Sequence, residues 1–286
     1  MDNIYDIVKS GMSFNKFEVG DLLFVEYTCP ITEEDSSVLS QTDFIVHVLS
    51  GKKVWKTNHK QWAAKSGETI YIKKGAFLID QYFDDDFCMF AFFIPDDFIR
   101  STLAEIKGRV ALNTKQVSPN FDAINIEKNA ILDGFFSSMY PFFKHTETLS
   151  SALLELKLKE LVINILTTDT NPELSCYFQS LGQTDRVSIP AVMERNFHYN
   201  LSIEEFATLC HRSISTFKRD FKQCFDSSPG KWLLNKRLEF AAMLLTRNQL
   251  NISRVAYESG FEDASHFSRA FKTKFGQSPN KFRQNR

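Results

Sequence analysis

The stretch ISRVAYESGFEDASHFSRAFKTKFGQSP, residues 252–279, decides the fold of the C-terminal third of the chain. From Ala264 onward its apolar residues recur at spacings of three and four, which predicts a helix with one buried stripe. The opposite side of that helix is polar and cationic, and Asp263 is placed to cap its start. A shorter helix over 252–258 precedes it, with Gly260 at the sharp turn. A helical hairpin with a solvated basic face would give this pattern, and so would a helix-turn-helix.

The same pattern occurs a second time, and this repetition favours the helix-turn-helix. Residues 213–222, SISTFKRDFK, align with residues 263–272, DASHFSRAFK, and both copies keep two phenylalanines and an outward arginine. The preceding helices also align, 203–207 with 252–256. An internal repeat of this kind implies two copies of one structural unit.

A single long helix is predicted between the two copies, over 229–247. It begins with a proline and carries its apolar residues on one face. At 1.5 Å per residue it spans roughly 27 Å, close to the ~34 Å between successive major-groove faces of a duplex. One chain could therefore present two reading helices to one side of DNA.

These motifs resemble the DNA-binding domain of the AraC/XylS family of bacterial transcription regulators. The family signature is present as Gly260-Phe261, then Ser265-His266-Phe267-Ser268-Arg269, then Phe275-Gly276-x-Ser278-Pro279. Two residues depart from it: His266 stands where tyrosine is usual, and Asp226 stands where the first copy usually has glycine. We expect Asp226 to allow a different end for the first reading helix.

The resemblance implies a sequence-specific regulator, more often an activator than a repressor, with double-stranded DNA and RNA polymerase as partners. Matching the motif positions gives the base-reading candidates, since arginine can bond a guanine edge and serine or histidine can make single contacts. These candidates are Ser215, Lys218, Arg219, Ser265, His266 and Arg269. The phosphate-binding candidates, which fix register without reading sequence, are Arg212, Lys222, Arg254, Lys272 and Lys274. The expected core residues behind them are Phe217, Phe221, Phe267 and Phe271.

The charge of the chain divides at the same place as its pattern. The whole chain has a net charge of −1, but residues 186–286 hold 17 Lys+Arg against 9 Asp+Glu. The remaining residues hold 17 against 26. A basic C-terminal part beside an acidic remainder predicts that only the C-terminal part meets a polyanion.

The N-terminal part alternates short apolar runs with turn residues from about residue 21 to residue 95, which predicts a β-sandwich or small barrel. The family typically has a cupin-like barrel here. The expected fold is therefore α+β with two domains: a cupin-like β-barrel with following helices, and an all-α domain with two helix-turn-helix units. We place the sensor domain at 1–170, a linker at 171–188 and the DNA-binding domain at 189–286.

The barrel residues leave the controlling signal open between a small-molecule inducer and a regulatory protein. Six aromatic residues are candidates for a ligand pocket or for a packed core, namely Phe44, Trp55, Tyr71, Phe77, Phe90 and Phe92. A metal-dependent cupin enzyme needs clustered imidazole ligands, but His47 and His59 stand alone on different segments. A DNA-repair alkyl-transfer protein needs a zinc-held cysteine cluster, which the sequence does not show. We therefore expect no metal, no cofactor and no enzymatic activity.

Helices are predicted over 96–107, 122–140 and 149–166. The last is apolar over more than one face, which fits packing on the barrel and a two-fold interface equally well. Family resemblance favours a homodimer. The five cysteines include no CxxC pair, no apolar run approaches the ~18 residues of a membrane span, and the N-terminus does not resemble a signal peptide. We therefore expect a cytoplasmic protein without a membrane partner.

Overall fold

A computed structural model describes residues 2–11, 14–28, 35–57, 60–81, 87–113, 115, 117–144, 150–183, 187–247 and 250–284. The chain forms two compact units, Asp2–Asp185 and Arg186–Arg286. Helix α5 (Pro172–Gln183) therefore occupies most of the segment that we expected to be a linker. It belongs to the N-terminal unit because Leu174, Phe178 and Leu181, spaced at four and three, are buried there.

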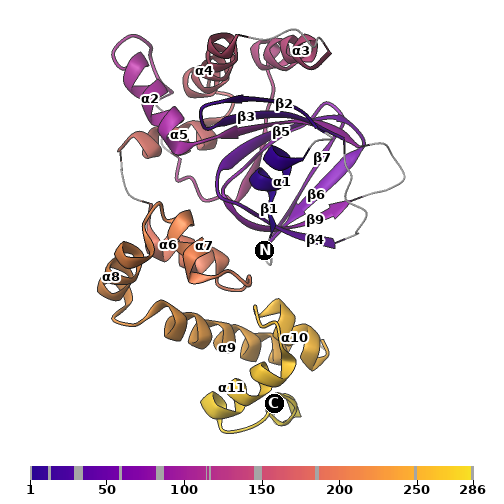
Figure 1. The fold of residues 1–286 in the computed structure, drawn as a ribbon, viewed down its shortest axis with the longest axis vertical. Helices are drawn as coiled ribbons and strands as arrows, with labels where there is room; N and C mark the ends of the chain where they lie inside the picture. Colours follow the sequence, from indigo (N-terminus) through magenta and orange to yellow (C-terminus); the bar gives the residue numbers. More distant parts are fainter. Residues whose placement is uncertain are drawn as a thin grey trace. The chain divides into compact units, whose positions relative to one another are not determined.

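The N-terminal unit contains two sheets (Figure 1). The six-stranded sheet has the order β11 (Ala123–Ile126), β8 (Thr69–Ile72), β5 (Asp43–Ser50), β10 (Cys88–Ile94), β3 (Leu22–Thr28) and β2 (Asn15–Val19). The five-stranded sheet has the order β1 (Asp2–Asn3), β4 (Asp35–Ser40), β9 (Gly75–Gln81), β6 (Lys52–Lys56) and β7 (Gln61–Lys65). Helix α1 (Ile4–Ser10) follows β1, which pairs with β4 in parallel, whereas the other strand pairs are antiparallel.

Alternation along the central strands creates two cores. In β10, Phe90 and Phe92 lie in a core shared with the helices, while Ala91 and Phe93 lie in a core shared with the five-stranded sheet. The register Phe92↔Phe24 and Phe92↔Ile45 aligns side chains of the first core across three strands. The unit therefore has three layers, and the α+β class is confirmed. Because the strands form two separate sheets, a closed barrel is not confirmed.

Helices α2 (Asp96–Ile106), α3 (Ala130–Lys144), α4 (Ser151–Thr167) and α5 supply the third layer. Figure 1 shows α3 and α4 over the face of the six-stranded sheet. The helix predicted over 122–140 is wrong in its first part, because residues 123–126 pair with β8 as β11. The helix begins later, where the Asn129 side chain accepts from the amides of Ile131 and Leu132 at 3.1 and 3.0 Å.

The C-terminal unit is entirely helical in its described residues. Its helices are α6 (Ile189–Asn196), α7 (Ile203–Leu209), α8 (Ile214–Phe225), α9 (Pro229–Arg247), α10 (Ile252–Glu258), α11 (Ala264–Phe275) and α12 (Pro279–Gln284). The predicted long helix is confirmed as the 19-residue α9, whose Leu238, Ala241 and Leu245 pack with α10 and α11. Across the part of the chain that the structure describes, no helix has the length and apolar character required to cross a membrane.

Candidate nucleic-acid interface

The first helix-turn-helix consists of α7 and α8, and side chains cap both helix starts. The Ser202 hydroxyl accepts from the Glu205 amide at 3.1 Å, and the Glu205 carboxylate accepts from the Ser202 amide at 2.7 Å. Ser213 caps α8 by accepting from the Thr216 amide at 3.3 Å. Between the helices His211 adopts a positive φ of 52°, which turns the chain sharply. These local bonds fix where α8 begins relative to α7.

The second helix-turn-helix consists of α10 and α11. The Asp263 cap is confirmed, because its carboxylate accepts from the Ser265 amide at 2.6 Å. That hydrogen bond is the main reason why the pKa of Asp263 is lowered. Gly260 has a φ of 85°, and a Cβ atom there would lie 2.8 Å from the His198 carbonyl oxygen. The turn therefore requires glycine both for its backbone angle and for its close packing.

The six predicted base-reading side chains all lie on exposed surfaces of the two helices. On α8 they are Ser215, Lys218 and Arg219, and on α11 they are Ser265, His266 and Arg269. Behind each face lies a pair of phenylalanines with 0% exposure, Phe217 with Phe221 and Phe267 with Phe271. The predicted core is confirmed, and each helix is anchored by its aromatic side while its polar side remains available to a ligand.

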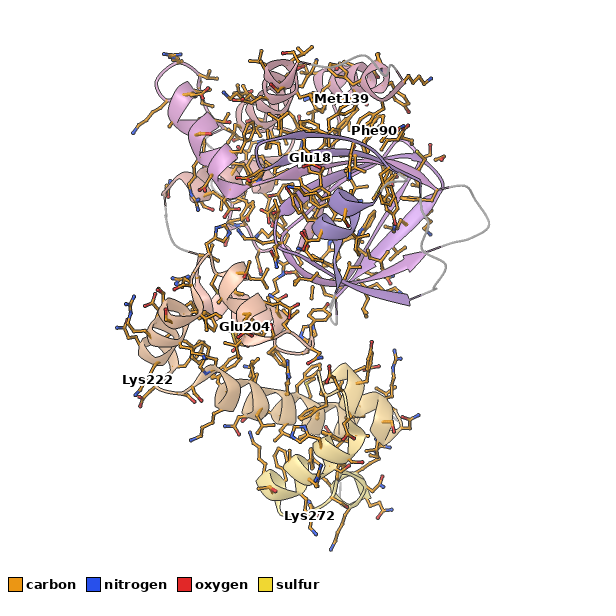
Figure 2. All side chains as sticks on the ribbon, in the orientation of Figure 1. Glu18, Phe90, Met139, Glu204, Lys222 and Lys272 are labelled. Carbon is orange, nitrogen blue, oxygen red and sulfur yellow. The ribbon has the colours of Figure 1, made fainter. Side chains whose placement is uncertain are left out.

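The phosphate-binding candidates separate into exposed and internally bonded side chains. Figure 2 labels Lys222 on α8 and Lys272 on α11, and both are exposed. Arg254 is also exposed and pairs along α10 with Glu258 at 2.8 Å. In contrast, Lys274 bonds to the Asn235 carbonyl and to Glu239 of α9, both at 2.9 Å. We therefore reassign Lys274 to the attachment of α11 to α9.

Arg212 also differs from its predicted role. Its guanidinium pairs with Asp220 at 3.1 Å and donates to the carbonyls of Val187 and Cys210 at 2.8 Å. The other oxygen of Asp220 accepts from Arg219 at 3.1 and 3.2 Å. Burial raises the pKa of Asp220, but the two arginines outweigh it and the pKa is lowered. Arg212 thus joins the turn to α8 and to the start of the unit, and it is not presented to a phosphate.

None of the basic residues of α9 was predicted as functional, and two of them, Arg237 and Lys231, differ in their surroundings. Arg237 donates to the carbonyls of Phe197 and Tyr199, both at 2.7 Å, and burial lowers its pKa. It therefore holds α9 against the chain after α6. Lys231 lies exposed at the start of α9, and the fifty-residue repeat places it over Lys281. That alignment was the available sequence signal for Lys231.

The six aromatic candidates do not share one pocket. Each is at most 2% exposed. Tyr71, Phe90 and Phe92 lie in the core under the helices, whereas Phe44, Trp55 and Phe77 lie in the core between the sheets. The strand alternation that separates the two cores also separates these side chains, so the prediction of a common aromatic pocket needs this correction.

His47 is a core residue on the helix side of β5. Its Nδ1 lies 2.8 Å from the Thr69 hydroxyl, and its ring stacks on Phe136 with centroids 4.3 Å apart. Burial, with a smaller effect of the Lys128 charge, lowers its pKa to about 4. Among the residues that the structure describes, no group of three or more His, Cys, Asp or Glu side chains could hold a metal. His59 lies outside those residues.

Both parts of the chain match known protein families. Residues 43–177 match the ExsA N-terminal regulatory domain, and residues 206–285 match a helix-turn-helix domain. Two relatives match at 19% identity over 263 residues, covering 92% of this chain and 96% of each relative. They are the thermoregulatory protein LcrF of Yersinia pestis and the virulence regulon transcriptional activator VirF of Yersinia enterocolitica. The chain belongs to the AraC/XylS family of transcription regulators.

The two matched segments of this AraC-family chain correspond to its two units. The regulatory-domain match runs from β5 into α5, and the helix-turn-helix match runs from α7 through α12. A solved structure of a transcriptional regulator from Chromobacterium violaceum, described as an AraC-type DNA-binding domain-containing protein, is also similar to part of this chain. Its structure has a TM-score of 0.31 and 29% identity, and the match covers 34% of this chain and 86% of that one.

Proposed function

We propose that this AraC-family regulator reads duplex DNA with α8 and α11, which enter successive major-groove faces. The observation that carries the proposal is the repeated construction of the two helices. Each presents a serine and an arginine at equivalent exposed positions over two fully buried phenylalanines. The 19-residue α9 gives the two helices a separation suited to one side of a duplex. The base-reading residues proposed above stay assigned to this contact, with Lys222, Lys272 and Arg254 as phosphate contacts.

We infer that the regulator activates transcription and that RNA polymerase is its further partner. The name of the Yersinia enterocolitica relative, a transcriptional activator, supports this sign of regulation. A regulatory role is non-enzymatic, and the site described here is built for binding. Its exposed groups are amines, guanidinium groups, hydroxyls and the His266 imidazole, all of which can donate hydrogen bonds, as a polyanion requires.

The N-terminal unit is proposed to receive the controlling signal. The match of residues 43–177 to a regulatory domain supports this role. The signal is a small molecule or a regulatory protein, and the packing of all six aromatic candidates favours the protein. Purified protein that binds its promoter fully without any added small molecule would support a protein signal. Strong binding only after addition of a metabolite extract of low molecular mass would contradict it.

A homodimer is proposed through the outer face of α4. The inner face of this helix buries Leu154, Leu158 and Leu161 at 0 to 2% exposure. The outer face leaves Leu153 42% and Leu156 61% exposed. Covering these large apolar side chains with a second copy of the chain would remove them from water, which favours association.

The deciding experiment is the binding of fragments of the protein's own promoter region at two salt concentrations. Arg269→Ala should weaken binding to the specific fragment by about 1 to 3 kcal/mol, roughly 5- to 150-fold, and leave binding to other fragments nearly unchanged. Lys236→Ala is the matched control, since the Lys236 amine already pairs with the Glu194 carboxylate of the same chain at 2.8 Å. Equal binding of all fragments, indifferent to Arg269, would refute α11 as a reading helix.

A further inference from the structure

A hollow of about 520 Å³ lies between the end of α8 and the start of α9. Three lysines line it, Lys218 and Lys222 from α8 and Lys231 from α9, together with the carboxylate-bearing Asp226. All three lysines are exposed. None of them takes part in a salt bridge with another side chain of the described residues. The hollow therefore carries an excess of two positive charges, which attracts an anion.

The backbone at this place adds unsatisfied donors. Helix α9 starts at Pro229, and the Trp232 amide is the first to donate back, to the Ser228 carbonyl at 3.0 Å. Within the described residues no acceptor is found for the amides of Gly230 and Lys231, both of which line the hollow. Free amides and the positive end of a 19-residue helix favour a phosphate oxygen.

The equivalent place in the second helix-turn-helix is built differently. The fifty-residue repeat puts Ser268 at the position of Lys218, and Gly276 at the position of Asp226. The Lys281 amide, equivalent to that of Lys231, is capped by the Ser278 hydroxyl at 3.4 Å. Within the described residues, the three-lysine arrangement with free amides is therefore found in the first helix-turn-helix and not in the second.

We propose that this hollow seats phosphates of the DNA backbone beside the first reading helix. The proposal rests on DNA binding by α8. It assigns a binding role to Lys231 and moves Lys218 from base reading to phosphate binding, because Lys218 and Lys222 stand one helical turn apart on the wall of the hollow. The first helix-turn-helix then contributes to DNA affinity mainly through charge, and Arg219 and Ser215 remain as its base-reading residues.

The test is the salt dependence of DNA binding for Lys218→Gln and Lys231→Gln in the full chain. Each substitution should reduce the slope of log K against log salt by about 0.9, and weaken specific and non-specific fragments alike. Lys231→Arg keeps the positive charge, so this variant should keep the wild-type slope. Lys236→Gln, on the same helix but paired with Glu194, should leave the slope unchanged. Thermal melting of each variant checks that it is folded.

The outcomes separate this site from DNA binding as a whole. If the affinity of the wild-type protein for its promoter falls steeply with salt and both variants keep the same slope, the hollow does not bind phosphates. DNA reading by α11 would then remain. A loss confined to the specific fragment would overturn phosphate binding in the hollow too, by returning Lys218 to base reading. Pyrophosphate is the probe for a small anion. Three results together would assign the hollow to a free anion instead of DNA. Pyrophosphate would raise the melting temperature of DNA-free protein, and Lys231→Gln would abolish that rise. The salt slope of DNA binding would not change in the variant.

Discussion

Asp226 ends α8 in the same left-handed conformation in which Gly276 ends α11. Their φ angles are 47° and 74°, and their amides donate to the Lys222 and Lys272 carbonyls at 2.9 Å. The sequence suggested that Asp226 would change how the first helix ends, and it does not. The geometry of the repeat is kept, and the residue adapts to a backbone conformation that favours glycine.

Asp226→Gly should therefore stabilise the C-terminal unit by about 0.5 to 1 kcal/mol, because it removes the steric cost of a side chain in the left-handed region. Chemical denaturation followed by circular dichroism measures the change. Gly276→Asp is the matched reverse substitution and should destabilise by a similar amount. Asp226→Asn removes only the charge, so a gain as large as that of Asp226→Gly would show that the carboxylate, not the backbone, is unfavourable.

Asp220→Asn should lower the melting temperature of the C-terminal unit at pH 7. The carboxylate accepts from Arg212 at 3.1 Å, and that arginine also ties the turn to the Val187 carbonyl. Since the pKa of Asp220 is lowered in the folded state, its contribution to stability is present above its ordinary pKa of 3.8. The contribution disappears as the pH falls through the lower, folded-state value.

Arg219→Ala provides the control for Asp220, because Arg219 is exposed and pairs with the same carboxylate. It should weaken binding to the specific DNA and leave the melting temperature nearly unchanged. A larger fall in melting temperature for Arg219→Ala than for Asp220→Asn would contradict the assignment of Arg212 to the internal bond.

The N-terminal unit should lose stability in mild acid because of His47. Its folded pKa of about 4 lies below the ordinary 6.5, so the unfolded chain binds more protons between these two values. Stability then decreases as the pH falls from 6.5 toward 4, by about 2 kcal/mol at pH 5. Urea unfolding at pH 7 and pH 5 measures this. Trp55 and Trp62 report on the unit in a Trp232→Phe background.

His47→Asn separates this effect from that of the acidic residues. Asparagine can keep the contact with Thr69 but cannot gain a proton, so the variant should be less stable at pH 7 and should depend less on pH. An unchanged difference between pH 7 and pH 5 would assign the acid sensitivity to carboxylates instead.

Leu156→Glu should dissociate the proposed dimer, since it places a charge on the exposed apolar face of α4. Light scattering coupled to size-exclusion chromatography gives the mass. Ile7→Glu on α1 is the matched control, because Ile7 is 41% exposed on a different helix. A dimer that survives Leu156→Glu places the interface elsewhere, and a monomeric wild-type protein contradicts the homodimer altogether.

The sequence predicted the C-terminal unit well because its elements are local. Fixed offsets between capping residues, glycine turns and phenylalanines determine each helix-turn-helix with little help from distant residues. It failed where the partners of a side chain lie in another element, 8 to 39 residues away. Arg212 and Lys274 looked like free cations until Asp220, Val187, Asn235 and Glu239 were placed beside them.

In the N-terminal unit the prediction errors have two causes. One helix lies in a stretch of mixed polar and apolar residues, and strand alternation places neighbouring side chains in different cores. Helix α5 was hidden in a polar stretch, although Leu174, Phe178 and Leu181 already had helical spacing. The aromatic residues were grouped by type, whereas the pleat sorts neighbours such as Tyr71 and Ile72 onto opposite faces. Which face meets the helices depends on tertiary contacts that the local pattern does not contain.

The last prediction concerns the attachment of α5 to the six-stranded sheet. The buried Asp43 carboxylate accepts from the Tyr71 hydroxyl at 2.5 Å, the Tyr177 hydroxyl of α5 at 2.7 Å and the Lys74 amide at 2.6 Å. Burial, and then the charge of Asp43, raise the pKa of Tyr71 well above its usual range, so this hydroxyl remains a donor. Tyr177→Phe removes one donor and should cost about 1 to 1.5 kcal/mol, whereas Asp43→Ala leaves several donors unpaired and should cost about 3 kcal/mol or more. Urea unfolding at pH 7 measures both, and equal costs would mean that the carboxylate does not organise this contact.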